Sequence, residues 1–243
     1  MKAKEFFTRV RKKVTAAYLT KVAVLSAVSF VLYMFAKFNL PFMFPSFLDV
    51  QFSELPAILA GFSLGPVAGG LVIVIKCLIK FPFSSTAFVG EITDMVLGIL
   101  YVVPASIVYQ IKKTRKNAVL GLLTGTLVAT FAAMLLNRFV SVPFYVEFFF
   151  KGNFDVIVNM CSVLYKDMTR DTFYWYYLFA AVLPFNLLRL GLVSGVTFLV
   201  YKRLSKILHW EIKPRKKTPP EEATEESASE EAQEAESQEP NKE

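Results

Sequence analysis

The side chains best suited to recognise a ligand lie inside the last long apolar stretch of the chain, at about residues 174–204. This stretch exceeds the ~20 residues that cross a bilayer, yet it contains Asn186 and Arg189. Residues three positions apart share one helix face, and an Arg at the membrane centre costs roughly 2.5–3.5 kcal/mol. The pair must therefore face protein, water or a ligand, and Pro184 adds a backbone carbonyl that needs a partner. Asn186 and Arg189 either hold helices together or bind a solute.

The carboxylates, cysteines and histidine of the chain limit the catalytic and metal-binding functions that it can have. Glu91 and Asp94 share a helix face, which suits a proton or cation site or, more often, stabilisation of a helix N-terminus. A single histidine, His209, rules out a Ser-His-Asp or Cys-His set. Cys77 and Cys161 form no CxxC or Cys/His cluster, so we expect no metal site, and a disulfide has weak support. No GxxxxGK[ST] motif is present. We therefore expect a protein that is not an enzyme.

Composition places the chain in a membrane. Of its 243 residues, 54% are hydrophobic, and the mean hydropathy is +0.46, which is too apolar for a soluble domain of this size. The net charge of +7 combines two opposite parts, because residues 211–243 hold 11 Glu against 5 Lys and Arg, whereas residues 1–210 hold 22 bases and 9 acids. The bases gather near helix ends, so they indicate topology and not nucleic-acid binding. We predict a multi-pass protein of the cell membrane.

The apolar segments predict an all-α bundle of six transmembrane helices. The N-terminus and the segments after the fourth and sixth helices are the most basic, which places both termini in the cytoplasm. Residues 140–173 are expected to be a long loop that contains an amphipathic surface helix at about 155–168. The short second segment is tilted, extended or re-entrant. The expected helices cover about residues 17–36, 54–64, 67–80, 88–109, 118–139 and 174–204.

Three regions follow from this pattern. Residues 1–16 form a basic cytoplasmic segment, residues 17–210 the six-helix membrane domain, and residues 211–243 a disordered acidic tail. Residues 38–53, with two prolines and five phenylalanines, either fold over a pocket as a lid, which we favour, or rest on the bilayer. Beneath that segment, Asn137 joins Asn186 and Arg189 at the outer face. Such a set suits a flat, polar-edged molecule, since aromatic walls stack on its plane while amides bind its edge.

Several motifs, in order, give the chain a resemblance to a known family. Over about residues 17–206 it resembles the riboflavin-specific substrate-binding (S) component of energy-coupling factor (ECF) transporters. The motifs are Phe47-Leu48-x-x-x-Phe52-Ser53-Glu54-Leu55-Pro56-Ala57, Gly65-Pro66-x-Ala68-Gly69, Gly90-Glu91 and Pro184-Phe185-Asn186-Leu187-x-Arg189.

The resemblance implies a function, partners and site residues. An S component of this family is embedded in membrane lipid and captures riboflavin from outside the cell. It works with a transmembrane coupling protein and two cytoplasmic ATPases. Flavin is then the transported ligand and not a cofactor. By resemblance, Ala23 and Ala27 contact the coupling protein, and Asn137 and Asn186 contact the flavin. The outer loop that closes on the flavin corresponds to Leu40, Pro41, Phe42, Met43 and Phe44.

The chain departs from the family pattern at one residue, and two alternative functions stay open. The family pattern usually ends in Lys where this chain has Arg189, and the planar fork of Arg grips phosphate better than Lys does. The ligand is therefore riboflavin or its phosphate ester (FMN), with riboflavin first. The alternatives are a non-transporting membrane scaffold and a stand-alone secondary transporter coupled to protons through Glu91 and Asp94. The absence of an inverted repeat argues against the transporter.

Overall fold

The computed structural model describes residues 15–45 and 47–208, and their side chains as far as residue 200. All of these residues belong to one compact unit within Met1–Trp210. The expectations for His209, the acidic tail and nearly all of the basic N-terminal segment lie outside the described residues.

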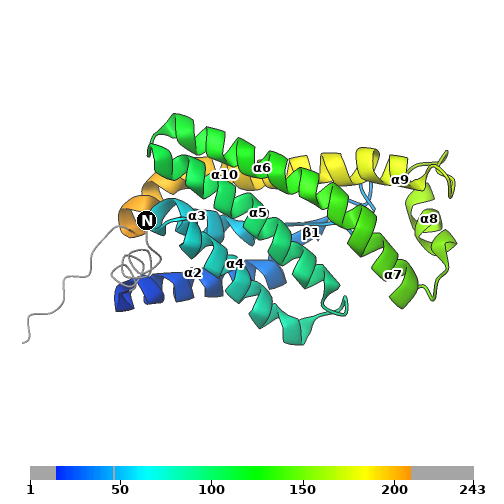
Figure 1. The fold of residues 1–243 in the computed structure, drawn as a ribbon, viewed down its shortest axis with the longest axis horizontal. Coiled ribbons are helices and arrows are strands. Elements are labelled where there is room, and N and C mark those ends of the chain that lie inside the picture. Colours follow the sequence, from blue (N-terminus) through cyan, green and yellow to red (C-terminus); the bar gives the residue numbers. More distant parts are fainter. Residues whose placement is uncertain (1–14, 46, 209–243) are drawn as a thin grey trace, which may run out of the picture. The chain divides into compact units, whose positions relative to one another are not determined.

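Helices form most of the described chain and run back and forth between two ends of a bundle (Figure 1). Thr15 and Thr114 begin two of them, since each hydroxyl accepts a hydrogen bond from the backbone N–H three residues on. Gly65 separates two others, because its φ of 112° is one that residues with a Cβ rarely adopt, and Pro66 then starts the next helix. The long elements are α2 (Ala16–Phe35), α3 (Glu54–Leu64), α4 (Pro66–Lys80), α5 (Val89–Ile111), α6 (Arg115–Leu136) and α10 (Leu183–Leu208).

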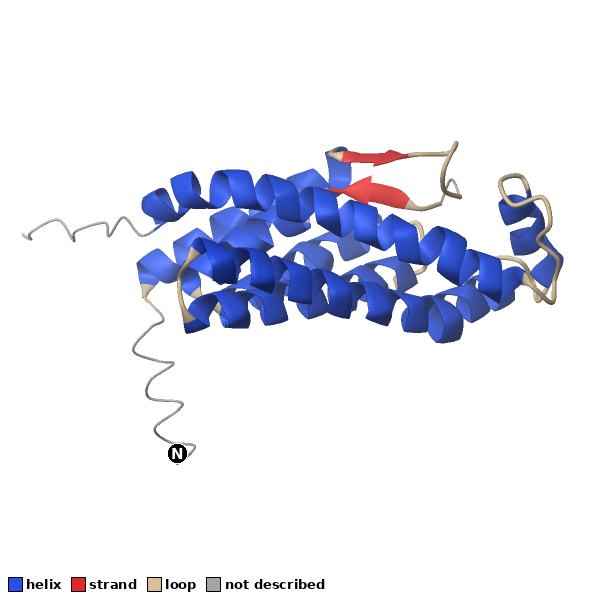
Figure 2. Cartoon of the chain, turned by 90° about the horizontal axis from the view of Figure 1, so that it is seen from above, coloured by secondary structure: helices blue, strands red, loops and turns tan. Residues whose placement is uncertain are grey.

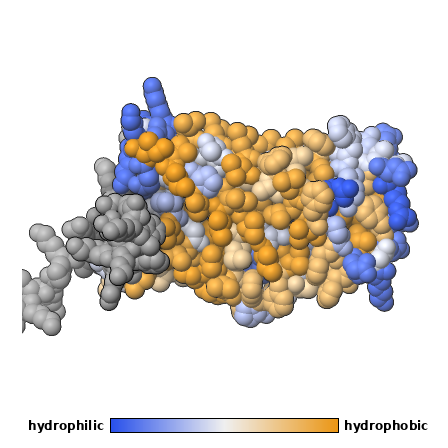
Figure 3. All heavy atoms as spheres, in the orientation of Figure 1, coloured by the Kyte–Doolittle hydropathy of each residue, from blue (hydrophilic) through white to orange (hydrophobic). Residues whose placement is uncertain are grey.

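The surface of the bundle matches a membrane environment. Figure 3 shows an apolar belt between two hydrophilic ends, and five helical stretches of the described chain are long and apolar enough to cross a bilayer. The expected second span is α3, which has only 11 residues and a length of roughly 17 Å. The all-α membrane fold is confirmed. The count of six spans and the cytoplasmic termini stay predictions, although α2 begins and α10 ends at the same end of the bundle (Figure 1).

A short β-hairpin lies in the aromatic segment expected to form a lid. Strands β1 (Lys37–Asn39) and β2 (Asp49–Gln51) pair antiparallel, with Phe38 opposite Val50, and Figure 2 shows them beside the helices. Val50 is fully buried and packs with Phe44 and Phe185. This packing fixes the hairpin to the start of α10.

Residues 140–173 are not one long loop, although residues 149–153 and 163–172 lie outside helices as expected. After α6 the chain continues through a π-helical segment, Asn137–Ser141, into α7 (Val142–Phe148), and α8 (Phe154–Ser162) follows. Pro143 does not end the helix, because it lies in the first turn of α7, and the wider π turn before it accommodates the missing N–H. Helix α8 is shorter than the surface helix expected at 155–168. The chain then enters α9 (Phe173–Trp175), a second π-helical segment (Tyr176–Val182) and α10.

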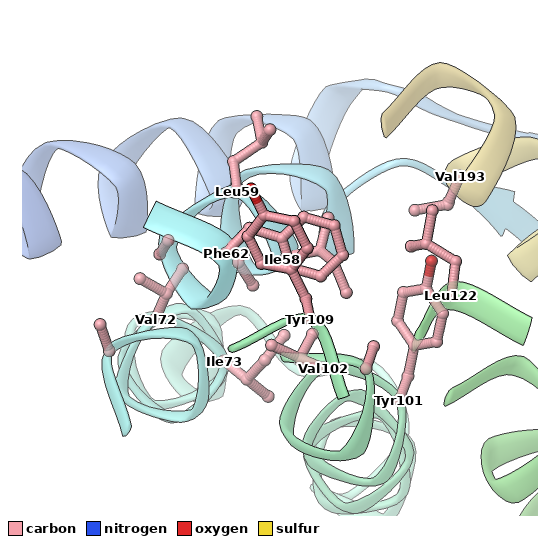
Figure 4. Packing of buried hydrophobic residues seen from close by; sticks show 14 of the residues in the cluster. Ile58, Leu59, Phe62, Val72, Ile73, Tyr101, Val102, Tyr109, Leu122 and Val193 are labelled. Atoms are coloured by element: carbon pink, nitrogen blue, oxygen red, sulfur yellow. The ribbon is translucent and has the colours of Figure 1, made fainter. Parts of the chain in front are cut away.

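The short helix α3 lies at the centre of the core. Nine of its eleven residues are buried, and Phe62 stacks on Tyr109 of α5 with ring centroids 4.2 Å apart (Figure 4). Gly69 of α4 allows close approach, since an added Cβ would lie 2.5 Å from Val102 Cγ1. The Tyr101 hydroxyl hydrogen-bonds Ser194 of α10 at 2.9 Å. These contacts join α3, α4, α5 and α10 into a fixed frame for the opposite, cavity-bearing end.

Candidate ligand site: a polar and aromatic cavity

A cavity of about 460 Å³ lies between the helix ends near the hairpin. Its wall combines the ends of α2 and α4, the start of α5, the two π-helical segments and the start of α10. Helix α10 begins at this end of the bundle and finishes at the other (Figure 1). The volume falls in the range of cavities that enclose small organic ligands.

Two amides, Asn137 and Asn186, line this cavity. Asn137 Oδ1 accepts a hydrogen bond from the Tyr177 hydroxyl at 2.9 Å, and Nδ2 donates to the Ala133 carbonyl at 2.8 Å. Asn186 Nδ2 donates to the Val182 carbonyl at 2.9 Å, whereas Asn186 Oδ1 accepts no hydrogen bond from the part of the chain that the structure describes. This oxygen is the acceptor left for a ligand.

Both amide-bearing helices contain a π-helical segment at the cavity. One segment begins at Asn137, and the other contains Tyr177 and ends at Val182, one turn before Asn186. A π turn inserts an extra residue and shifts the side chains that follow, and such turns occur frequently at functional sites. The hydroxyl of Tyr177 connects the two segments through Asn137. Both amides that line the cavity therefore lie at or next to an irregular turn of the backbone.

A buried group of four charged side chains, here called the ion quartet, forms one side of the site. It comprises Glu54, Lys76, Asp94 and Arg189, of which Asp94 and Arg189 line the cavity while Glu54 and Lys76 are 0% exposed. Arg189 Nη2 bonds Glu54 Oε1 and lies 3.3 Å from Asp94 Oδ1. Lys76 Nζ lies 2.9 Å from Asp94 Oδ2 and 4.0 Å from Glu54 Oε1. Two positive and two negative charges thus compensate one another, as buried charges must.

Neutral groups connect the ion quartet to the hairpin. Lys76 Nζ donates to Ser53 Oγ at 2.6 Å, and Gln51 Nε2 donates to Asp94 Oδ1 at 2.7 Å. The Tyr33 ring of α2 lies 4.7 Å from Lys76 Nζ, a cation–π contact. The quartet therefore links β2 and α3 to α2, α4, α5 and α10.

Glu91 belongs to a separate group from Asp94. Its Oε1 lies 3.3 Å from Lys80 Nζ, and its Oε2 accepts hydrogen bonds from Ser84 at 2.7 Å and Thr86 at 2.8 Å. Both carboxylates of the expected pair are buried, but each has its own cation. Both therefore act as ion-pair partners inside the protein, and Glu91 also lies in the first turn of α5, where a carboxylate stabilises the helix N-terminus.

The charges on the cavity wall cancel. Each cation that lines the cavity lies within 4 Å of a carboxylate that also lines it, so no side of the site is strongly charged. The pairs are Lys37–Asp49 at 3.5 Å, Lys80–Glu91 at 3.3 Å and Arg189–Asp94 at 3.3 Å.

Aromatic rings supply much of the remaining wall. Tyr177 is 2% exposed and stacks on Phe173 with ring centroids 5.2 Å apart, and Phe47 approaches it from the loop at 6.2 Å. Phe185 of α10 packs edge-on against Phe44, with the ring centroids 5.4 Å apart. Rings fixed in this way offer flat surfaces on which a planar ligand can stack. The aromatic lining residues are Tyr33, Phe47, Tyr145, Phe149, Phe150, Tyr177 and Phe185.

The loop residues expected to contact the ligand do not line the cavity. Phe44 is buried against Phe185, Leu40 packs on the same cluster, and Pro41, Phe42 and Met43 are exposed. The loop contributes Phe47 and Leu48 instead. Sequence alone could not separate these positions, because every residue from Leu40 to Leu48 except Ser46 is apolar.

The expected partner surface, Ala23 and Ala27, lies on the exposed side of α2. Both side chains are exposed, whereas Val22, Ser26 and Ser29 of the same helix are buried. The small residues thus leave a flat strip facing away from the core. A strip of this kind permits close approach of another helix.

Sequence reasoning missed Lys76, Glu54 and Gln51. Lys76 carries the clearest signal, since a single charge within the apolar run of α4 must find a buried partner. Among the described residues, both cysteines are free and buried, and no group of three His, Cys, Asp or Glu side chains is arranged to hold a metal ion.

Membrane-length helices that enclose a cavity lined by amides and aromatic rings define an integral membrane protein that binds a small molecule. More specifically, the chain belongs to the family of ECF transporter substrate-specific components, whose model matches residues 17–201.

Curated relatives and one solved structure are similar to this chain. The "Riboflavin transporter RibU" of Staphylococcus aureus is 33% identical over 190 residues, which cover 78% of this chain and 91% of the relative. The protein of the same name from Streptococcus thermophilus is 34% identical over 84% of this chain and 87% of its own length. A solved S component of a bacterial ECF transporter is 30% identical, with a TM-score of 0.60, and the match covers 79% of this chain and 98% of that one.

Proposed function

We propose that this chain binds riboflavin in the cavity and delivers it to an ATP-driven ECF importer. The observation that carries the proposal is the convergence of Asn137 and Asn186 on a cavity walled by aromatic rings. A flavin presents a flat tricyclic plane with a polar edge, which needs stacking surfaces and a few hydrogen-bonding groups. The relatives from Staphylococcus aureus and Streptococcus thermophilus, both named riboflavin transporters, support the same ligand.

The charge balance favours riboflavin over FMN. Riboflavin is uncharged, whereas a phosphate ester brings a charge of about −1.5 to −2 at neutral pH. The fork of Arg189, the group expected to grip a phosphate, is engaged by Glu54 and Asp94. A phosphate in the cavity would have to compete with these carboxylates in a medium of low dielectric constant.

A stand-alone proton-coupled transporter is not favoured. Glu91 and Asp94 were the candidate proton carriers, but each is held by a cation and by further hydrogen-bond donors. Family membership instead supports a membrane coupling protein and two cytoplasmic ATPases as partners. The exposed strip of Ala23 and Ala27 is the surface we assign to the coupling protein.

Titration of the purified chain tests the ligand. We expect riboflavin to quench tyrosine and tryptophan fluorescence saturably at one equivalent, and to bind more tightly than FMN. Tighter binding of FMN would reverse the assignment of the substrate.

Uptake in cells tests the transport mechanism. Riboflavin uptake that depends on this chain should survive a protonophore and stop when ATP is depleted. The opposite pattern would favour the proton-coupled alternative.

A further inference from the structure

Asp94 lies where the buried ion quartet meets the cavity. Its side chain lies at the cavity wall, 6% exposed, and it receives Lys76 Nζ at 2.9 Å, Gln51 Nε2 at 2.7 Å and Arg189 Nη2 at 3.3 Å. Like Glu54, it lies within 4.0 Å of both cations of the ion quartet, but of these two carboxylates only Asp94 lines the cavity. Its charge is therefore the one that an incoming ligand meets together with Arg189.

We propose that Asp94, with Glu54 behind it, sets the charge selectivity of the cavity: it neutralises Lys76 and Arg189, so that the uncharged flavin is accepted and its phosphate ester is disfavoured. This inference rests on the proposed function. It assigns to Asp94 a role in ligand discrimination besides its role in the packing of α5.

The physical reason is the imbalance that a phosphate would create. With Asp94 and Glu54 ionised, the quartet is neutral, and the other two cations at the wall, Lys37 and Lys80, have their own carboxylates. A phosphate in this cavity would add negative charge without an uncompensated cation among the described lining residues to meet it, and charge interactions are strong in a poorly solvated site. An uncharged ligand incurs no such cost.

The contacts of Arg189 also favour an uncharged ligand. Its Nη2 reaches both carboxylates, and its buried Nε has no partner among the described residues. The guanidinium therefore does not form a two-pronged pair with either carboxylate. Loss of one carboxylate would leave Arg189 held through Nη2 by the other alone, so the guanidinium would be more available to a ligand anion.

The substitution Asp94→Asn tests the proposal, because it removes one charge and keeps the shape of the side chain. The quartet then has a net charge of +1. We expect the ratio of the FMN to the riboflavin dissociation constant to fall at least tenfold relative to the unaltered chain. Glu54→Gln makes the same change of charge at a fully buried position of the quartet. It should lower the ratio as well. If one of the two variants folds poorly, the other still tests the proposal.

Two further variants separate charge from packing. The double variant Asp94→Asn with Lys76→Gln restores neutrality and should restore the original ratio. Asp155→Asn makes the same chemical change at an exposed position of α8 that does not line the cavity, and it should leave the ratio unaltered.

The outcomes are distinct. Equal weakening of both ligands in Asp94→Asn and Glu54→Gln, with an unaltered ratio, would show that the carboxylates only hold the fold and would overturn the proposal. Failure of the unaltered chain to bind riboflavin at all would overturn the proposed function instead. A lower ratio that the double variant does not restore would also contradict the proposed charge mechanism.

Discussion

Replacement of Asn186 by Leu should weaken riboflavin binding while the protein stays folded. The amide is 6% exposed at the cavity wall, and its Oδ1 is the acceptor without a partner among the described residues. Leu has a similar volume but offers neither an acceptor nor a donor, so a ligand N–H that faces Oδ1 would be buried unpaired.

The structure sets the expected magnitude. An unpaired buried polar group costs about 1–3 kcal/mol, which corresponds to a rise of roughly 5- to 150-fold in the dissociation constant. The cost to folding is smaller. The substitution removes one hydrogen bond within a continuous helical stretch, from Asn186 Nδ2 to the Val182 carbonyl, and a hydrogen bond contributes about 0.5–1.5 kcal/mol net to stability.

Fluorescence titration with riboflavin gives the affinity, and thermal denaturation in detergent gives the stability. Asn117→Leu is the matched control, because Asn117 also donates through Nδ2 to a backbone carbonyl, that of Val108, at the opposite end of α6. The control should bind riboflavin normally. An Asn186→Leu variant with the affinity of the unaltered chain would remove this residue from the site and refute the argument.

Three further predictions follow. Lys76→Met breaks the ion quartet and should destabilise the fold by about 3–5 kcal/mol, because it leaves two buried carboxylates, Glu54 and Asp94, to share the single charge of Arg189; an unshifted thermal denaturation curve would contradict this. Large side chains at Ala23 and Ala27 should preserve riboflavin binding but abolish uptake, whereas normal uptake would show that the strip is not the contact surface. Burial raises the pKa of Cys161 to about 12, and Cys77 is also buried. The native chain should therefore resist maleimide at pH 8 and the unfolded chain should take two labels, so rapid labelling of native protein would contradict the burial.

The sequence predicts much of the fold because apolar length is a strong signal in membrane helices. The expected helix at about 88–109 corresponds to Val89–Ile111, and the short segment 54–64 is helical over those residues. The loop expected after Phe139 begins instead as a helix that continues to Phe148, because Pro143 follows a π turn and does not end the helix. The sequence does not predict the hairpin, because two three-residue strands carry little pattern of their own.

The candidate site could be predicted only in part from the sequence. Asn186 and Arg189 were expected to share a face with a common target, and the structure places both at the cavity with Asn137. The partners of Arg189 could not be predicted, because Glu54 lies 135 positions away and its burial depends on the packing of α3. Glu91 and Asp94 are close in sequence yet belong to different ion groups, a separation set by the positions of Lys80 and Lys76.

The absorption spectrum of the chain purified from riboflavin-fed cells tests the central claim most directly. We expect a yellow protein that carries one flavin per chain, with the flavin fluorescence quenched because the ring system stacks on aromatic side chains. A colourless protein that also gains no flavin on addition of excess riboflavin would contradict the claim that this cavity is a flavin site.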